Sequence, residues 1–278
     1  MREDAAMRIE NEELLVEINP LGGALSRIYD KKEGKEILYD GKGAWMKTDL
    51  ILFPVIGANN VYSLNGEQYR IPWKHGFAQH ALFETEILSE ASLVLSLQGN
   101  GEKESGYPFP FFLKLEYSLK GRELLRKTEI QGQDLTFQFG LHPAFRTDFS
   151  SCLLEVEEGT DLFVLDRTDG IIKKEIPWPY PLRWRIQKED IVNHDTFVLS
   201  NPKGEIRFQN GLGTSIHLRS QCPYFALWTP KEDSKDDFLC LESWYGISPY
   251  ADMPMDLSKR KGVNRVDGIL VFEDTLDF

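Results

Sequence analysis

Three residues of this chain are candidates for acid–base chemistry: His75, His142 and Glu242. Histidine titrates near neutrality, so its ring can donate or accept a proton at physiological pH. Glu242 lies between a leucine and aromatic residues, and a carboxylate is rarely buried in such surroundings without a function, because its desolvation is costly. Together these groups suit a reaction in which one hydroxyl loses a proton while a neighbouring oxygen gains one.

Ring opening of an aldose is a reaction of this kind. A base takes the proton from the anomeric oxygen O1, an acid protonates the ring oxygen O5, and the C1–O5 bond breaks. Closure on the other face inverts the anomer, and no cofactor is required. Each positioned donor or acceptor contributes about 10²–10⁴-fold. The residue types therefore predict a cofactor-free acid–base site, provided that folding brings the three side chains together.

Strands are the elements that must position these groups. Apolar and polar residues alternate in many short runs, and turn signals recur with the spacing found in β-sandwiches. The clearest hairpin covers residues 111–130, and Asn65-Gly66 is a strong signal for another tight turn. Gly132 is expected to break the return strand, and residues 135–139 then lead into His142. Two runs between residues 83 and 97 flank residues 88–92, and further strands are predicted at residues 14–18, 24–29, 36–39, 153–156, 162–165, 196–199, 205–208, 215–218, 225–228, 238–241 and 268–272.

These patterns predict an all-β fold, a large antiparallel β-sandwich that forms a single domain over residues 1–278. No long stretch keeps an apolar period of 3.6, and a short helix is expected only at residues 255–261. A Rossmann fold is excluded because it needs helical crossovers and a glycine-rich strand-to-helix turn. The proline-rich residues 176–181 are predicted to form a surface loop.

The composition limits the possible partners. The net charge is −12 at pH 7, whereas nucleic-acid binding needs a basic stripe for the phosphates, so no nucleic acid is expected. The apolar runs are too short to span a membrane. We expect a cytoplasmic monomer or homodimer whose partner is a small molecule. The three cysteines, Cys152, Cys222 and Cys240, lack C-x-x-C spacing. Neither a disulfide framework nor a metal site is therefore expected.

Three motifs resemble signature blocks of the bacterial aldose 1-epimerase family, the galactose mutarotase-like proteins. They are His-Gly-Phe-Ala at 75–78, His-Pro-Ala-Phe at 142–145 and Leu-Glu-Ser-Trp-Tyr-Gly at 241–246. Each block is short, but further similar blocks follow the family's order, so the resemblance spans nearly the whole chain. These supporting blocks lie at residues 21–26, at 52–57 with Trp45 ahead of them, and at 259–263.

The resemblance implies an isomerase of carbohydrate metabolism, built on a galactose mutarotase-like sandwich with an open cleft for a sugar. It makes His142 the general acid towards O5 and Glu242 the base at O1, while His75 helps to hold O5 and the sugar hydroxyls. Glu242 must then be ionised while His142 is protonated, which implies a bell-shaped pH–rate profile. Asp195, in a more loosely matched block, would hold the substrate. The other substrate-binding candidates are Arg146, Asn59, Gln79 and Trp244.

Two departures from the family bear on the substrate. Many relatives carry an arginine where this chain has residues 58–60, and another where it has Gln79. In the hexose-6-phosphate epimerase branch such arginines engage the phosphate, which their planar fork suits. Their absence favours a free hexose. Arg146 and Lys74 stand beside the motifs as substitute cations, so a hexose-6-phosphate 1-epimerase stays open as an alternative.

The sequence leaves two functions of other classes open. A carbohydrate-binding or sensing protein of the same fold could keep the acid and the base only as hydrogen-bonding groups. Glu242 and Asp195 could also be the carboxylate pair of a glycosidase, which would leave both histidines unexplained. Each side chain also has a structural interpretation, since an isolated histidine is more often a hydrogen-bonded core residue than a catalyst.

Overall fold

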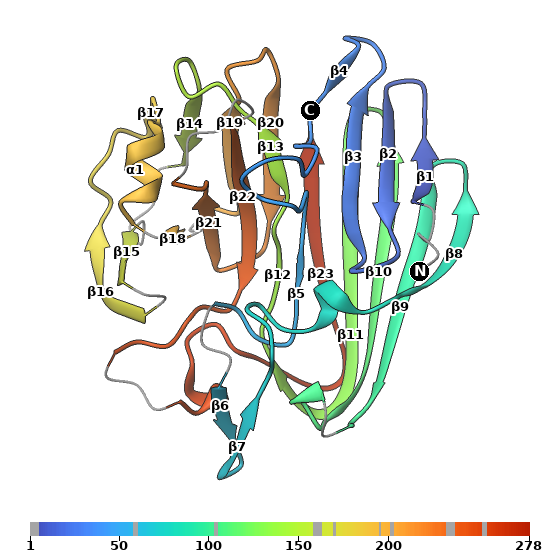
Figure 1. The fold of residues 1–278 in the computed structure, drawn as a ribbon, viewed down its shortest axis with the longest axis vertical. Helices are drawn as coiled ribbons and strands as arrows, with labels where there is room; N and C mark the ends of the chain where they lie inside the picture. Colours follow the sequence, from blue (N-terminus) through green and yellow to red (C-terminus); the bar gives the residue numbers. More distant parts are fainter. Residues whose placement is uncertain are drawn as a thin grey trace.

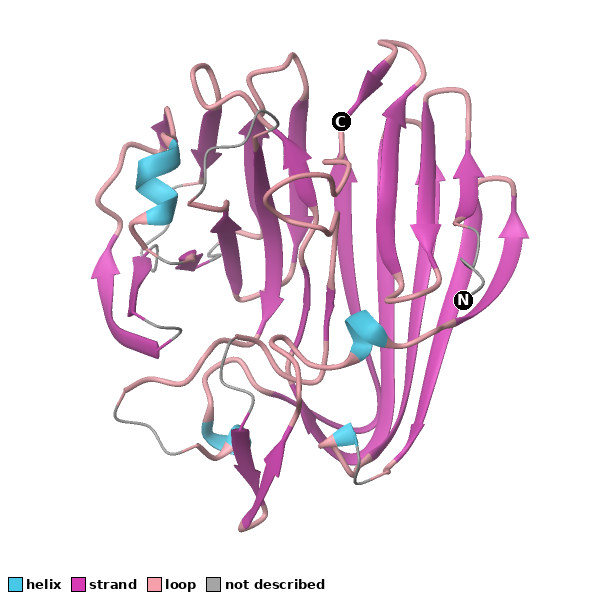
Figure 2. Cartoon of the chain, viewed as in Figure 1, coloured by secondary structure: helices cyan, strands magenta, loops and turns pink. Residues whose placement is uncertain are grey.

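The computed structural model describes residues 6–57, 61–102, 105–157, 163–168, 171–194, 196–200, 203–231, 237–251 and 255–278. Antiparallel strands dominate these residues, as Figures 1 and 2 show. Two large sheets face each other across the main core, where Tyr245 and Phe272 pack with ring centroids 4.3 Å apart. The predicted all-β antiparallel sandwich is therefore confirmed.

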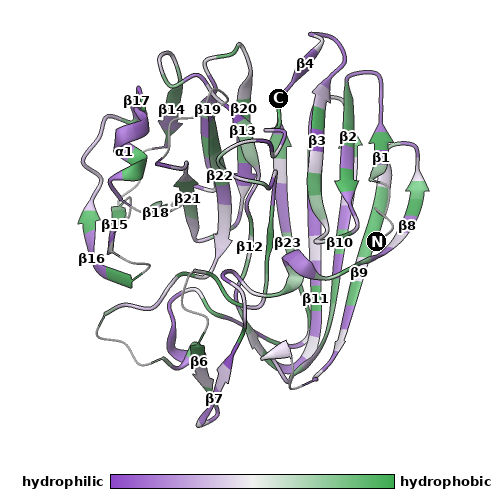
Figure 3. Cartoon of the chain, in the orientation of Figure 1, coloured by the Kyte–Doolittle hydropathy of each residue, from purple (hydrophilic) through white to green (hydrophobic). Residues whose placement is uncertain are grey.

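The larger sheet has nine strands in the order β17-β14-β19-β20-β23-β11-β10-β9-β8. Along β10 every second residue from Phe111 to Leu119 is buried, as the alternation predicts, and Figure 3 shows alternating hydropathy along the long strands. The bounds are β8 Glu84–Ser89, β9 Ser92–Asn100, β10 Pro110–Lys120, β11 Glu123–Phe137, β14 Leu153–Val156, β17 Arg183–Trp184, β19 Glu205–Gln209, β20 Ser215–Ser220 and β23 Asn264–Asp277.

The second large sheet follows the order β16-β15-β18-β21-β22-β12-β5, and β13 also pairs with β22. Its central strand β22 is buried throughout, and its residues alternate between two faces. Leu239, Leu241 and Tyr245 join the main core, whereas Glu242 and Trp244 belong to the opposite face. The bounds are β5 Ile51–Leu52, β12 Phe139–Leu141, β13 Ala144–Arg146, β15 Phe163–Thr168, β16 Ile171–Pro177, β18 Phe197–Ser200, β21 Tyr224–Trp228 and β22 Phe238–Tyr245.

Smaller elements complete the described part of the chain. Asn65 and Gly66 both have positive φ, 55° and 82°, as the predicted tight turn between β6 and β7 requires. Within the described residues, no helix is long and apolar enough to cross a membrane. The bounds are β1 Met7–Glu10, β2 Leu14–Asn19, β3 Ala24–Asp30, β4 Lys35–Glu36, β6 Val61–Leu64, β7 Glu67–Arg70, η1 Ala78–His80, α1 Lys188–Val192 and η3 Leu257–Lys259.

Some local expectations differ from the structure. Gly132 does not end the return strand: β11 continues to Phe137, and a register shift between Gly132 and Leu135 accommodates one extra residue as a bulge. The strand expected at 36–39 ends at Glu36, and the short helix expected at 255–261 is only the 3₁₀ turn η3. The proline-rich segment begins inside β16, which pairs through Pro177.

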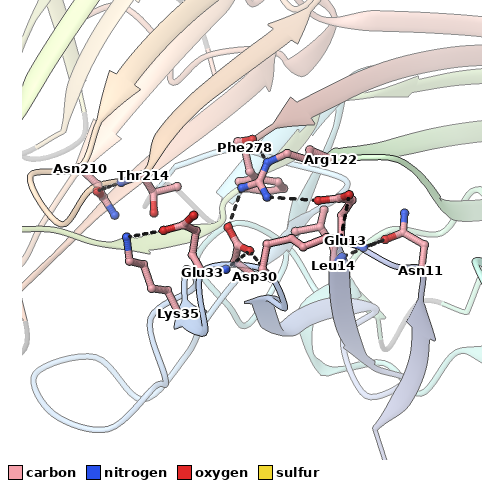
Figure 4. A network of polar contacts seen from close by, with 11 residues as sticks. Asn11, Glu13, Leu14, Asp30, Glu33, Lys35, Arg122, Asn210, Thr214 and Phe278 are labelled. Atoms are coloured by element: carbon pink, nitrogen blue, oxygen red, sulfur yellow. Dashed lines mark hydrogen bonds and ion pairs between the residues drawn. The ribbon is translucent and has the colours of Figure 1, made fainter.

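An ion pair joins the small amino-terminal sheet to the turn between β10 and β11 (Figure 4). Arg122 Nη2 donates to Asp30 Oδ2 at 2.6 Å, and the same carboxylate accepts the backbone N–H groups of Lys32 and Glu33. Only 3% of the Asp30 side chain is exposed. Burial raises the pKa of Asp30, but the Arg122 guanidinium and the backbone donors outweigh it, so the net pKa is lowered.

Replacement of this carboxylate tests the ion pair. Asp30→Asn is expected to reduce the free energy of unfolding at pH 7 by about 1–3 kcal/mol, because a charged hydrogen bond is lost at a buried site. A lowered folded-state pKa contributes stability above the ordinary value of 3.8 and loses it as the pH falls through the folded value. Urea titrations at pH 7 and pH 3 should therefore show the difference shrinking in acid. An equal difference at both pH values would contradict this assignment.

Candidate active site

His142 and Glu242 meet because β12 and β13 pair with β22 on either side of Glu242, and His142 lies in the turn between β12 and β13. β12 and β13 both pair with β22, and the register places the turn between them, His142-Pro143, opposite Glu242. His142 Nε2 lies 3.3 Å from Glu242 Oε1, with 7% and 0% of the two side chains exposed. The predicted acid and base are thus direct neighbours, shielded from bulk water.

The backbone of His142 is held by buried acceptors. Its N–H approaches Leu50 O at 3.1 Å and Asp49 Oδ1 at 3.2 Å. Asp49 also accepts from Arg126 Nη2 at 2.7 Å and from the backbone of Leu25 at 3.0 Å. Since Arg126 belongs to β11, this carboxylate connects the nine-stranded sheet to the turn that carries the imidazole.

His75 enters the site from a tight loop after β7. Its φ is 62°, and Gly76 follows with a φ of 85°. A Cβ on Gly76 would lie 2.0 Å from Phe53 O, so only glycine fits beside that backbone. Gly57 donates its N–H to His75 Nδ1 at 3.2 Å. Nδ1 is therefore the unprotonated nitrogen, and Nε2–H remains as a donor.

The ring of His75 lies beside the acid and the base. Its centroid is 5.8 Å from that of His142 and 6.3 Å from that of Trp244. Burial lowers the pKa of His75 well below its ordinary value, and the charges of His142, Lys74 and Arg167 lower it further. His75 is therefore neutral and suited to donating a hydrogen bond to a sugar oxygen, as its predicted assisting role requires.

These three residues line one pocket with a volume of about 190 Å³. Gln79 and Trp244, two of the predicted substrate-binding residues, belong to the same lining. Two further predicted residues, Asn59 and Asp195, lie outside the described residues, although Thr196 reaches the pocket. The complete lining is Trp45, Leu50, Lys74, His75, Gln79, His142, Thr196, Trp228, Glu242 and Trp244.

Arg146 is not among the lining residues. It pairs with Phe238, four residues along β22 from Glu242, which corresponds to roughly 13 Å in a strand. Its position directly after the His-Pro motif made it a candidate, but β13 carries it away from the pocket. Gln79, by contrast, uses its amide within the loop, where it donates to Lys74 O at 2.6 Å and Gly76 O at 3.2 Å.

Three tryptophans surround the acid and the base. Trp244 donates its indole N–H to Glu242 Oε2 at 2.7 Å. Trp45 stacks on the imidazole of His142, with centroids 5.2 Å apart and an interplanar angle of 29°. Trp228 packs against the same imidazole in an edge arrangement, with ring centroids 6.2 Å apart. The sequence marks Trp45 only as the flank of a motif, yet Trp45 lies beside the predicted acid and is partly exposed.

Burial dominates the electrostatics of the two reacting groups. It lowers the pKa of His142 to about 3, a shift that a backbone hydrogen bond opposes and the charge of Lys74 assists. It raises the pKa of Glu242 well above the ordinary value, while the Trp244 hydrogen bond and the Arg167 charge act in the opposite direction. The two groups are in contact, so they titrate as a pair. Burial therefore favours a state of the pair that holds a single proton.

That single proton has two possible positions. In one form both side chains are neutral, and in the other an imidazolium faces a carboxylate; the two forms contain the same number of protons. Burial favours the neutral form, whereas ring opening in the predicted direction starts from the charged form.

Among the residues that the structure describes, no group of three or more His, Cys, Asp or Glu side chains is arranged to hold a metal ion.

Comparisons with known proteins agree with this architecture. The model of the aldose 1-epimerase family matches residues 6–253. Two proteins from Lactococcus lactis subsp. lactis, the plasmid and chromosomal forms of Protein LacX, are each 26% identical to this chain over 94% of both chains. The structure of a galactose mutarotase-like protein from Lactobacillus casei superposes with a TM-score of 0.89 and 22% identity, covering 98% of this chain and 99% of that one.

A second solved structure, a galactose mutarotase related enzyme from Lactobacillus acidophilus, superposes with a TM-score of 0.87 and 20% identity. It covers 98% of this chain and 97% of that one. Both structures share the fold of this chain along almost its full length, which confirms the galactose mutarotase-like sandwich expected from the motifs.

Proposed function

Because this chain belongs to the aldose 1-epimerase family, we propose that it interconverts the α and β anomers of a free hexose by acid–base ring opening. The observation that carries the proposal is the contact of 3.3 Å between His142 Nε2 and Glu242 Oε1 at the pocket. O1 and O5 are bonded to the same carbon of the sugar. An acid and a base that serve them must therefore lie close together, as these two atoms do.

The reaction begins from the charged form of the pair. The Glu242 carboxylate takes the proton from O1, the O–H electrons form the C1=O1 double bond, and the C1–O5 bond breaks. The electron pair of that bond takes the proton from His142 Nε2. Rotation about C1–C2 turns the carbonyl, after which His142 deprotonates the O5 hydroxyl, O5 attacks the other face of C1 and Glu242 returns its proton to O1. The pair ends with the proton it started with.

The remaining lining residues would hold the sugar. His75 donates through Nε2–H to O5 or to an adjacent hydroxyl, and Trp45 offers a ring face to the sugar's C–H bonds. Asp195 and Asn59 keep their proposed substrate-binding roles from the sequence. The position of Thr196 in the pocket supports that role for Asp195, its neighbour in the chain.

The shared proton predicts the pH dependence. The pair binds a second proton only as the pH falls towards the His142 pKa of about 3. Because the pKa of Glu242 is raised, the pair keeps its single proton when the pH rises above 4.5, the ordinary pKa of a glutamate. The rate should therefore be level across the mildly acidic range and fall on the alkaline side, where the pair loses its last proton. Initial rates between pH 4 and 10, corrected for the buffer, measure this. A rate that rises steadily up to pH 10 would contradict these roles.

Polarimetry on freshly dissolved α-D-glucose and α-D-galactose tests the proposal. The protein should accelerate the approach to the equilibrium rotation in proportion to its concentration. If a panel of hexoses shows binding without acceleration, the chain is a carbohydrate-binding or sensing protein and the enzymatic proposal fails. Release of a chromophore from an aryl glycoside would instead indicate a glycosidase.

One observation favours a phosphorylated hexose as the second candidate. Lys74 lines the pocket and is exposed, and none of the hydrogen bonds and ion pairs found among the described residues engages its ammonium group. An exposed lysine suits a phosphate as a point charge, without the planar fork of arginine.

The ratio of two substrates distinguishes these candidates. Under the phosphate hypothesis, Lys74→Met should lower kcat/KM for glucose 6-phosphate about 10–100-fold more than for glucose, because one charged hydrogen bond contributes about 1.5–3 kcal/mol. Lys47→Met provides a matched control, since Lys47 is exposed and its charge acts on His80, but it does not line the pocket. An equal loss for both sugars in Lys74→Met would support the free hexose.

A further inference from the structure

We propose that Arg167 is a positioning residue that acts through the indole of Trp244 to favour the carboxylate form of Glu242. Arg167 lies on β15 and is buried, and its Cζ is 5.6 Å from the centroid of the Trp244 ring. The indole N–H of the same tryptophan donates to Glu242 Oε2 at 2.7 Å. The cation, the aromatic ring and the carboxylate therefore lie in series.

The fold fixes the cation on the ring. Arg167 Nη2 donates to Ser248 Oγ at 3.2 Å, and Nη1 donates to Thr196 O at 3.3 Å. The register of β15 against β16 shifts between Asp166 and Arg167, and such an irregularity re-aims a side chain. Arg167 is not among the residues that line the pocket. Its charge acts on Glu242 and His75 from outside the pocket, and its ring contact with Trp244 connects it to the indole that donates to Glu242.

The chemistry of this series has a definite direction. A cation over the face of an indole is attracted by the π electrons, and more strongly where water is excluded. Electron density drawn towards the guanidinium makes the indole N–H a stronger donor. A stronger hydrogen bond to the carboxylate favours its charged form. Arg167 would thus shift the shared proton from Glu242 towards His142, which is the form that starts ring opening.

Several other charged or titratable groups face Glu242, and they do not all act in the same direction. Burial and Asp49 favour the protonated carboxyl, whereas the Trp244 hydrogen bond, Arg167 and Lys74 favour the carboxylate. Trp244 and Arg167 are both buried and held by defined contacts, unlike the exposed Lys74. The titratable and charged groups around Glu242 are His142, His75, Asp49, Lys74, Cys240 and Arg167.

A double-mutant cycle with Arg167→Met and Trp244→Phe tests the coupling. Arg167→Met should lower kcat about tenfold with little change in KM, and it should move the alkaline limb of the pH–rate profile to higher pH. The Trp244→Phe variant keeps a ring but has no N–H donor. In this background, Arg167→Met should lower kcat by a smaller factor than it does in the wild type. Arg167→Lys, which retains the cation, should recover part of the loss. Additive effects, or a loss confined to KM, would overturn the proposal.

The kinetic half of this test rests on the proposed function, so a second measurement avoids the sugar. Titration of the Glu242 carboxyl by ¹³C NMR, assigned with Glu242→Gln, should give a higher pKa in Arg167→Met than in the wild type. Ser248→Ala removes one hydrogen bond to the guanidinium and should move the pKa in the same direction, which keeps the test decisive if Arg167→Met fails to fold. An unchanged pKa in the folded variants overturns the inference even if the wild type is an active epimerase. A raised pKa in a chain without epimerase activity supports the inference while the proposed function fails.

Discussion

Glu242→Gln lowers kcat for anomer interconversion by about 10²–10⁴-fold, the range expected for loss of a positioned base. The amide cannot take the proton from O1, but it has nearly the same shape, and its carbonyl oxygen can still accept the Trp244 N–H that now lies 2.7 Å from Oε2. The effect should therefore appear in kcat and leave KM nearly unchanged. Polarimetric progress curves at several sugar concentrations separate the two constants.

Two controls sharpen this prediction. Glu242→Asp keeps a carboxylate but withdraws it from its partners, so it should retain more activity than Glu242→Gln. Cys240→Ala changes the same face of β22 two residues away, where the thiol packs in a small apolar cluster, and it should affect stability more than kcat. If Glu242→Gln kept wild-type kcat, the assignment of the base would be wrong.

His142→Ala is expected to cause a loss of kcat of the same order, because O5 then has no proton donor when the C1–O5 bond breaks. The backbone contacts of this residue to Leu50 O and Asp49 remain available, so the turn should keep its shape. The deleted ring leaves space beside the pocket. Added imidazole should therefore restore part of the rate, which a purely structural histidine would not allow.

The acid and the base act in the same two steps, so their losses should not add. The double variant His142→Ala with Glu242→Gln should be about as slow as the slower single variant, as is usual for residues that work as one unit. Additive losses would mean that the two side chains serve separate steps, in conflict with the shared proton. Circular dichroism and thermal melts of all three variants check that the fold is retained.

Much of the fold follows from local patterns. The alternation in β10 predicts which residues are buried, and Asn65-Gly66 predicts the turn between β6 and β7. The bulge in β11 is different, because Gly132 alone does not show whether a strand ends or continues with a shifted register. Pairing of β11 with β23 along its whole length decides that outcome, and the partner strand lies far away in the sequence.

The motifs predict three residues that the structure brings to one pocket, but they do not predict how these residues meet. The motifs single out His75, His142 and Glu242, yet only the register of β12 and β13 on β22 shows why the second and third touch. No local pattern predicts the places of Trp45 and Arg167, because each reaches the site through a tertiary contact. A charged residue near the end of an apolar run is the only sequence signal for Arg167.

Burial changes the expected protonation of the pair. The roles that the resemblance implies need a protonated His142 and an ionised Glu242, whereas burial lowers the pKa of the first and raises that of the second. The two descriptions agree once the pair is treated as sharing one proton, since the charged form is a tautomer of the neutral one. The bell-shaped profile expected from the sequence then becomes broad. The contacts that favour the charged tautomer gain importance for the rate.

Exchange between anomers at equilibrium tests the central claim most directly. Two-dimensional ¹H exchange NMR on an equilibrated hexose near neutral pH reports transfer between the α and β anomeric protons without any net reaction. The wild-type protein should produce exchange cross-peaks whose rate scales with its concentration, and Glu242→Gln and His142→Ala should abolish them at the same concentration. A wild-type protein that binds the sugar without exchange cross-peaks, or variants that exchange as fast as the wild type, would contradict the acid–base mechanism.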